Sequence, residues 1–446
     1  MKRIGGIVLW VMGLTLLLSG CLFSPGDELY ALPALSEEYS NLQRMREELV
    51  RTGLEYAAPL SGGNTQTVQL RDLDHNGVDE AIVFFRDTGG GEKPLKIYIF
   101  RQNSRDLYET AAVIEGAGTA INSIVYCDIT GSGTEDLVVS WQMASNVYTL
   151  SAYSMYGFTP TELMSSAYTG YSVCDMDQDN LSEIVLLRLD NSEAGSNRAE
   201  MYDYENGAME LRSEAQLSQS ITAIDRKRYS YLQDAVPALF VTSYMSETTR
   251  VTDILAMRDG ALTNITLDPE TNISAETIRY YVTYGTDINN DSMLELPMPI
   301  VLPSYGASSV VDSFWLLDWR QFNVNGSAQS IMTTYHNRTD GWYFQIPDNW
   351  IGRLTISRRN SVSGERAVVF SRWIDEQTPP QDFLILYRLT GDNREVRSTM
   401  GNRQVLVVEN DEIYSFELLE NSWDCGLDKD DILERFNFIK TEWQQE

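Results

Sequence analysis

One stretch places a carboxylate at every second position and then becomes apolar: Asp175-Met176-Asp177-Gln178-Asp179-Asn180-Leu181-Ser182-Glu183-Ile184-Val185-Leu186. Alternating acidic side chains in so short a segment gather several oxygens around one turn. The β-branched and apolar residues that follow are typical of a buried strand. The stretch therefore predicts an acidic loop that joins two strands.

The same pattern recurs along the chain. Further copies lie at 72–83, 128–139 and 287–296, and a fifth start at Asp225 keeps the apolar runs without the acidic loop. The leading aspartates stand roughly fifty residues apart, a period typical of repeated supersecondary units. About four strand-like runs fill each period. We therefore expect a mainly β fold with a β-propeller-like domain of about five repeats.

The acidic loops are candidate metal sites. Ligands at positions 1, 3, 5 and 9, with a backbone carbonyl at position 7, surround one cation with oxygen, and Ca²⁺ accepts six to eight such ligands in flexible geometry. Three loops have near-complete sets: Asp72, Asp74, Asn76, Val78 and Glu80; Asp175, Asp177, Asp179, Leu181 and Glu183; and Asp287, Asn289, Asp291, Met293 and Glu295. We expect structural calcium in these three.

The remaining loop offers a poorer set. Its candidate ligands are Asp128, Thr130, Ser132 and Asp136, with only two carboxylates, so we expect weak binding or none. None of the loops is an EF-hand, because position 12 holds an apolar residue where an EF-hand requires a bidentate glutamate. The alternative is that all four are acidic Asx-type turns that hold no ion.

The loop pattern resembles the FG-GAP and VCBS repeats of integrin-type propellers and bacterial surface proteins. The resemblance covers roughly residues 66 to 333. It implies propeller blades in which calcium ties strands together, held by the ligand positions given above. Integrin-type propellers have seven blades, whereas five repeats are visible here.

The N-terminus has the layout of an export signal. Lys2 and Arg3 precede an apolar run from Ile4 to Leu18, which is too short for a confident membrane span. The tetrapeptide 18–21 resembles a bacterial lipobox, which implies cleavage after residue 20 and lipidation of Cys21. We expect a lipid anchor on the extracytoplasmic face of the cell membrane. The alternative is an ordinary signal, cleaved or retained, with a chance cysteine.

Composition limits the partners. The formal net charge is −30, and removal of the signal makes it about −32, so nucleic acid is excluded as a partner. Cys127 and Cys174 precede two of the acidic loops. They form either a disulfide or two buried thiols, and we favour the thiols.

Four segments follow from these patterns. They are the signal peptide (1–20), a tether (21–35), the repeat domain with an N-terminal helix at 36–52 (36–333) and a small α+β domain (334–446). The last segment combines several strand-like runs with a final helix. Asp428 caps this helix, and Ile432, Phe436, Ile439 and Trp443 line it. Its opening residues are faintly similar to PsbP-like domains, and no functional residue carries over.

No catalytic motif is present. The chain has only two histidines, His75 and His336, and neither lies in a recognisable catalytic pattern. We therefore expect a non-enzymatic lipoprotein that binds an unidentified protein or glycan of the cell envelope, or serves as a scaffold there. The alternative is a calcium-dependent polysaccharide hydrolase or lyase at the cell surface, since carboxylate pairs abound.

Overall fold

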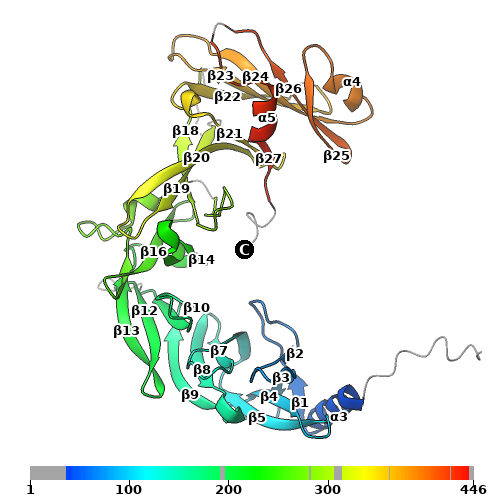
Figure 1. Cartoon of the computed structure of the whole chain (residues 1–446), viewed down its shortest axis with the longest axis vertical. Helices are drawn as coiled ribbons and strands as arrows, with labels where there is room; N and C mark the ends of the chain where they lie inside the picture. Colours follow the sequence, from blue (N-terminus) through cyan, green and yellow to red (C-terminus); the bar gives the residue numbers. More distant parts are fainter. Residues whose placement is uncertain are drawn as a thin grey trace, which may run out of the picture. The chain divides into compact units, whose positions relative to one another are not determined.

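The fold is mainly β and built from antiparallel sheets (Figure 1). The computed structural model describes residues 37–190, 196–280, 283–305, 314–360, 362–421 and 423–440. Cys21, the signal segment and the tether lie outside these ranges. Within them, no helix combines the length and the apolar character that a membrane span requires.

The chain divides into two compact units. The first holds the described residues up to Ile124 together with Gly157–Pro160. Its helix α3 (Glu37–Arg51) confirms the helix expected at 36–52, and Leu42 on this helix is buried against the neighbouring sheet. The strands of that sheet are β1 (Leu54–Tyr56), β2 (Val68–Arg71), β3 (Glu80–Asp87), β4 (Leu95–Gln102) and β5 (Tyr108–Gly116).

Three four-stranded sheets follow, each with its strands in chain order. The division between the units falls within the first strand, β6. The strands are β6 (Ala120–Cys127), β7 (Asp136–Ala144), β8 (Val147–Ser154) and β9 (Thr161–Tyr168); β10 (Gly170–Cys174), β11 (Glu183–Arg188), β12 (Arg198–Glu205) and β13 (Ala208–Gln216); and β14 (Ala223–Tyr231), β15 (Pro237–Tyr244), β16 (Arg250–Arg258) and β17 (Ala261–Asn264). The short 3₁₀ turns are η1 (Tyr156–Phe158), η2 (Gln233–Ala235), η3 (Ala275–Thr277) and η5 (Asp348–Trp350).

The second strand of each repeat is buried on both faces. In β11, Ile184 and Leu186 pack with the β6–β9 sheet, whereas Val185 and Leu187 pack with the β14–β17 sheet. Successive side chains of a strand point to opposite faces, so one apolar run supplies two neighbouring cores. This explains why continuous apolar runs follow the acidic loops. Cys127 and Cys174 are free thiols, as favoured from the sequence, and burial raises both thiol pKa values to about 12.

The fifth sheet collects strands from distant parts of the chain. It has the order β18 (Leu296–Val301), β19 (Trp315–Phe322), β20 (Ala328–Asn337), β21 (Trp342–Gln345) and β27 (Phe436–Phe438). The sixth has the order β22 (Leu354–Arg359), β23 (Glu365–Arg372), β24 (Gln381–Thr390), β26 (Glu412–Leu418) and β25 (Gln404–Glu409). Helices α4 (Arg394–Ser398) and α5 (Lys429–Arg435) complete the described chain.

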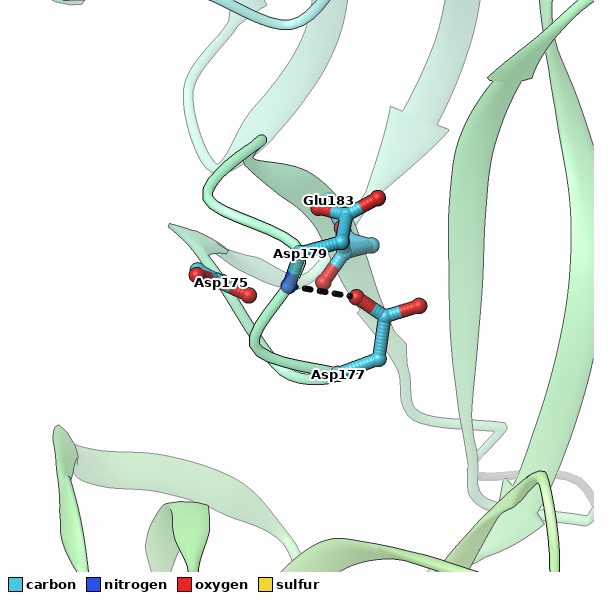
Figure 2. A group of neighbouring side chains, drawn as sticks. All are labelled: Asp175, Asp177, Asp179 and Glu183. Atoms are coloured by element: carbon cyan, nitrogen blue, oxygen red, sulfur yellow. Dashed lines mark hydrogen bonds between the residues drawn. The ribbon is translucent and has the colours of Figure 1, made fainter.

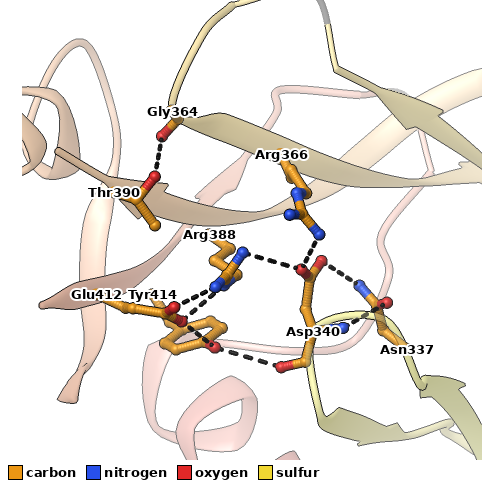
Figure 3. Close-up of polar contacts among 8 residues, drawn as sticks. All are labelled: Asn337, Asp340, Gly364, Arg366, Arg388, Thr390, Glu412 and Tyr414. Atoms are coloured by element: carbon orange, nitrogen blue, oxygen red, sulfur yellow. Dashed lines mark hydrogen bonds and ion pairs between the residues drawn. The ribbon is translucent and has the colours of Figure 1, made fainter. Parts of the chain in front are cut away.

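A polar cluster ties the fifth and sixth sheets together (Figure 3). Asp340, in the turn between β20 and β21, accepts from Arg366 at 2.8 Å and from Arg388 at 3.3 Å. Tyr414 of β26 donates its hydroxyl to the Asp340 backbone carbonyl at 3.3 Å. Trp342, Trp350 and Phe370 fill the adjoining apolar core. The tryptophans that open this region are therefore core residues.

Asp225 lies inside β14, and only residues 232–236 join β14 to β15, so this repeat lacks the acidic loop, as expected from the sequence. Two other expectations need adjustment. The expected boundary between residues 333 and 334 falls within β20. The final helix is capped by Asp428 as predicted but ends at Arg435, because Phe436–Phe438 pairs with β21. Trp443 lies outside the described residues.

Candidate metal centres

The loop between β10 and β11 brings four carboxylates together (Figure 2). Asp175, Asp177, Asp179 and Glu183 each offer an oxygen, and these oxygens all lie within 4.8 Å of one another. Glu183, the first residue of β11, is 1% exposed, whereas Asp177 and Asp179 face solvent. Oxygen-only donor sets of this kind suit a hard divalent cation. The cluster could hold one metal ion.

Backbone amides give this loop its shape. Asp175 accepts from the N–H groups of Gln178 at 2.6 Å and Asn180 at 3.0 Å. Both of these residues have positive φ, 65° and 70°, so the chain turns tightly around the Asp175 carboxylate. Glu183 accepts from the Met176 amide at 2.6 Å. The first and last acids therefore fix the two ends of the loop.

The loops at Asp72 and Asp287 repeat this geometry. Asp72, Asp74 and Glu80 form one group of converging carboxylates, and Asp287, Asp291 and Glu295 form another. The closing glutamates accept from the Leu73 and Ile288 amides, both at 2.9 Å. The predicted amide ligands lie in the same loops: Asn76 Oδ1 accepts from the Val78 amide and Asn289 Oδ1 from the Asp291 amide.

At position 7, Leu181 and Met293 donate their N–H groups to the position-5 aspartates, as Val78 does to Asn76. Their backbone groups thus lie at the loop. The structure therefore brings together the carboxylates of all three near-complete sets of predicted ligands.

The loop at Asp128 is closed by hydroxyl groups. Thr130 Oγ1 donates to Ser132 Oγ at 3.0 Å and lies 2.9 Å from Asp136 Oδ2, and Ser132 Oγ lies 2.8 Å from Thr134 Oγ1. Asp136 is fully buried and also accepts from the Ile129 and Met155 amides. Among the described residues, no group of three converging acids forms here. Internal hydrogen bonds thus satisfy the groups that would face an ion.

Burial shapes the electrostatics of the three acidic loops. Burial raises the pKa of Glu80, Glu183 and Glu295 to about 7, hydrogen bonds from backbone amides oppose the rise, and neighbouring aspartates add to it. Burial and Asp179 also raise the pKa of Asp177. Burial and neighbouring negative charges both disfavour the ionised form of these carboxyl groups. A bound cation would favour the ionised form.

One polar residue that contacts these loops, Gln321, was not predicted from the loop pattern. Gln321 of β19 is 4% exposed, and its Nε2 donates to Asp291 Oδ2 and Glu295 Oε1, each at 2.6 Å. It stands 26 residues beyond Glu295 in the chain, so no loop motif contains it. Only the pairing of β18 with β19 brings it to the loop.

A cavity of about 600 Å³ opens beside the first loop, within the first unit. Its walls combine ligand residues of that loop with charged and aromatic side chains: Asp74, Asn76, Val78, Glu80, Arg101, Gln102, Asn103, Ser104, Asp106, Glu109 and Phe158. Arg101 pairs with Glu109 at 3.3 Å and lies 5.5 Å from the Phe158 ring centroid. This volume far exceeds that of one ion and falls in the range of small-molecule sites.

Neither histidine supplies an evident base. His336 packs against Trp319 and Tyr343, with ring centroids 5.8 and 5.2 Å away. Burial and nearby Arg338 lower the His336 pKa to about 3, so the imidazole is neutral at physiological pH. His75 sits in the first acidic loop with a φ of 55°, between the predicted ligands Asp74 and Asn76.

Comparison with known proteins reveals only distant similarity. Neither a protein-family model nor a curated protein matches the chain. Among solved structures, the exotype rhamnogalacturonan lyase YesX matches 74% of this chain and 74% of its own, with 12% identity and a TM-score of 0.31. A protein from Bifidobacterium bifidum s17 assigned as an exo-beta-1,3-galactanase matches 64% of this chain and 93% of its own, with 8% identity and a TM-score of 0.24.

These comparisons contradict the expectation of a non-enzymatic binding or scaffold protein. Both structures are named as enzymes, a rhamnogalacturonan lyase and an exo-beta-1,3-galactanase. At TM-scores this low they identify no residue and no substrate for this chain, and the chemistry must come from its own side chains.

Proposed function

We propose that the protein is a calcium-dependent hydrolase or lyase that acts on a polysaccharide at the cell surface. The observation that carries the proposal is the 600 Å³ cavity beside the first acidic loop. Its size suits a sugar unit, its polar lining suits hydroxyl groups, and Phe158 offers a ring face against which a sugar can pack.

The charged residues of this cavity are of the types that glycosidic-bond hydrolysis and lyase reactions require. Hydrolysis of a glycosidic bond uses two carboxyl groups, one of which transfers a proton to the leaving oxygen. Asp106 and Glu109 line the cavity, and Arg101 holds Glu109 at 3.3 Å. A lyase needs a base and a cation that neutralises a substrate carboxylate, and Glu109 and Arg101 could serve in these roles.

The three acidic loops are proposed to bind Ca²⁺. Converging oxygens within 4.8 Å, an all-oxygen donor set and closing glutamates with raised pKa values support this assignment. Bound calcium would supply positive charge at each loop. The protein's own part is to hold the loop ends through Asp175 and Glu183 and their equivalents, so that the first and second strands of each repeat stay joined.

The repeats are proposed to be blades of a propeller of FG-GAP or VCBS type. Support comes from the successive antiparallel sheets and from second strands that share their side chains between two neighbouring cores. The acidic loop stands directly before an apolar strand in four places, ahead of β3, β7, β11 and β18.

The protein is proposed to be anchored by lipid at Cys21, on the extracytoplasmic face of the cell membrane. The charge order of residues 1–20 and the small residues before Cys21 support this location. Replacement Cys21→Ala should move the protein from the membrane fraction to the soluble fraction in cell fractionation. An unchanged membrane fraction would exclude the lipid anchor.

Activity can be tested by incubating the full-length protein with a panel of pectic, galactan and other envelope polysaccharides, with calcium or with a chelator. New reducing ends would indicate cleavage, and ultraviolet absorbance of unsaturated products would identify a lyase. Glu109→Gln should lower turnover at least about a hundredfold because it removes an acid–base group. Glu115→Gln, on the same strand but outside the cavity, is the matched control. Absence of cleavage across the panel in calcium would refute the proposal.

A further inference from the structure

A cavity of about 320 Å³ lies at the edge strand β22 of the sixth sheet, within the second unit. Its walls combine two aromatic rings, several hydroxyl groups and one carboxylate, among them Ser304, Tyr305, Phe314, Ser357, Ser371 and Asp382. A sugar has apolar ring faces and a rim of hydroxyl groups, so it binds where aromatic rings lie beside a few polar side chains. The lining of this cavity therefore suits a sugar unit.

Hydrogen bonds hold the two aromatic residues in place. The Phe314 backbone carbonyl accepts from the Leu302 amide at 2.9 Å, and the Phe314 ring packs against the core between the fifth and sixth sheets. Two residues before Tyr305, the Pro303 carbonyl accepts from Thr355 Oγ1 of β22 at 2.6 Å. Tyr305 itself is 46% exposed. Its ring is therefore open to a ligand, on a backbone that is fixed to the sheet.

The carboxylate of this cavity is oriented and still has acceptor capacity. Asp382 Oδ1 accepts from Ser371 Oγ at 2.8 Å, and Asp382 Oδ2 accepts from Arg359. The two oxygens of a carboxylate offer about four lone-pair positions, so each oxygen can accept one more hydrogen bond. The Asp382 side chain is 31% exposed. Sugar hydroxyls are donors that this carboxylate can accept.

A second cavity, of about 150 Å³, also borders β22 and is positively charged. Its lining includes the guanidinium groups of Arg358 and Arg366 and the carboxylate of Asp340. Figure 3 shows that Asp340 already accepts from Arg366 and from Arg388, at 2.8 and 3.3 Å. The lining thus has two positive groups and one negative group, in a chain whose net charge is −30.

Arg358 connects the two cavities. Its guanidinium lies over the Phe314 ring, 5.3 Å from the centroid, and among the described residues it pairs with no carboxylate. Phe314 lines the larger cavity and Arg358 lines the smaller one. A guanidinium offers five N–H donors in a planar fork that matches the two oxygens of a carboxylate. A ligand in the larger cavity therefore meets a carboxylate-binding group beside Phe314.

We propose that this edge of the sixth sheet binds a polysaccharide whose sugar units carry carboxylates. The larger cavity holds one sugar ring against Tyr305 and Phe314, and carboxylates of the chain bind Arg358 and the smaller cavity. An acidic polymer is repelled by most of a protein of charge −30, so it binds where positive charge is concentrated. This site binds without cleaving, so it goes beyond the proposed activity and does not rest on it.

Calorimetric titration of full-length protein that carries Glu109→Gln, in the presence of a chelator, tests the proposal. The substitution limits cleavage of the probe, and the chelator removes calcium that would otherwise bridge acidic loops and acidic sugars. The two probes are a galacturonate tetramer, which carries carboxylates, and a galactose tetramer, which carries none. The galacturonate tetramer should bind more tightly at low salt and should lose this advantage at high salt.

Two substitutions of exposed residues separate the contributions. Arg358→Gln should weaken binding of the galacturonate tetramer about tenfold and leave the galactose tetramer almost unaffected, because only the first offers a charged partner. Tyr305→Ala should weaken both tetramers about tenfold, because both pack a sugar ring against it. Arg394→Gln and Tyr280→Ala are the matched controls. Arg394 pairs with Asp411, Tyr280 is 69% exposed, and neither residue lines these two cavities.

Several results would overturn the proposal. They are no binding of the galacturonate tetramer, equal losses for both tetramers in Arg358→Gln, and unchanged affinities in Tyr305→Ala. Inorganic phosphate that binds as tightly as the galacturonate tetramer would indicate a small-anion site and would overturn it as well. A protein that binds the tetramer at this edge but cleaves no polysaccharide refutes the proposed activity alone. A protein that cleaves, but whose affinities are unchanged in both variants, refutes this site alone.

Discussion

At the scale of single residues, the closing glutamates of the three acidic loops have the most strongly raised carboxyl pKa values in their loops. Glu80, Glu183 and Glu295 are almost fully buried, and each stands beside two or more aspartates of its own loop. Burial opposes their ionisation, so in the absence of a cation a proton is the available counter-charge. Protons and calcium therefore compete for the same oxygens.

This competition predicts how stability depends on pH. The carboxyl pKa of Glu183 rises from its ordinary 4.5 to about 7 in the folded state, so the folded protein binds this proton more tightly than the unfolded chain. Without calcium, its contribution to stability is complete below about pH 4.5 and is lost as the pH rises through about 7. The rise in melting temperature caused by calcium should accordingly be larger at about pH 8 than at about pH 5.

Melting curves recorded with calcium and with a chelator across this pH range test the prediction. Glu183→Gln should flatten part of the chelator curve, because the amide does not titrate. Equal calcium shifts at both ends of the range would contradict a role for these glutamates in metal binding.

Individual ligands should differ in importance. Asp175→Ala or Asp177→Ala should remove the stabilisation of one site, about 2.7 kcal/mol at a calcium concentration a hundred times Kd. Thr130→Ala should leave the calcium-dependent part of stability almost unchanged, because its loop is closed by hydroxyls. The measurement is the difference in unfolding free energy with and without calcium. Equal losses in these variants would refute the ranking.

The convergence of the acids within each loop could be predicted from the sequence. The carboxylates of each loop lie within nine consecutive residues, so their convergence can be expected from the local sequence. Gln321 could not be found in this way, because its contact depends on the register between β18 and β19. The same applies to Arg101 and the cavity that it lines.

At the scale of elements, the loop at Asp128 shows that one framework can close with or without carboxylates. Its leading aspartate accepts from the Ser132 and Gly133 amides, much as Asp287 accepts from the Asp291 and Ser292 amides. What differs is the interior, where the hydroxyls of Thr130 and Ser132 occupy positions that hold acids in the loop at Asp175. The backbone of the loop at Asp128 therefore already has the shape that the acidic loops have, and only the side chains differ.

Substitution of the hydroxyls should create a metal site. The double variant Thr130→Asp, Ser132→Asp restores the alternating acids of the loop at Asp175, and we expect one additional calcium ion per chain. Calorimetric stoichiometry measures this change. The double variant Thr130→Val, Ser132→Ala removes the same hydroxyls without adding charge and should gain no ion. Unchanged stoichiometry in the acidic variant would show that the loop geometry is insufficient.

Helices and strands were predicted well where the apolar residues follow a single clear pattern, either helical spacing or a continuous buried run. The helix at 37–51 and buried strands such as β3 and β11 follow from clear apolar patterns. The final helix was extended too far, because Phe436 continues the helical spacing of Ile432 although it starts β27. The missing acidic loop after Asp225 could be predicted from the sequence, but only the pairing of β14 with β15 shows that Asp225 itself lies inside a strand.

At the scale of the whole molecule, the charge of −30 makes cations important for stability. Each calcium ion that binds the folded chain removes part of the repulsion among its acids. Millimolar calcium should raise the melting temperature, and a chelator should lower it, because a ligand specific to the folded state shifts the unfolding equilibrium. Magnesium at the same concentration is the control, since its rigid octahedral geometry fits these loops poorly. A melting temperature insensitive to calcium would exclude structural ions.

The last described strand has a consequence for the order of assembly. β27 lies beside β21, although the whole sixth sheet separates them in the chain. β27 is synthesised after the whole sixth sheet, so β21 lacks its partner on this side until β27 has been made. Non-local pairings of this kind close slowly. A truncated chain would keep that edge open and would tend to add a strand from another molecule, so the C-terminal residues act as a cover against aggregation.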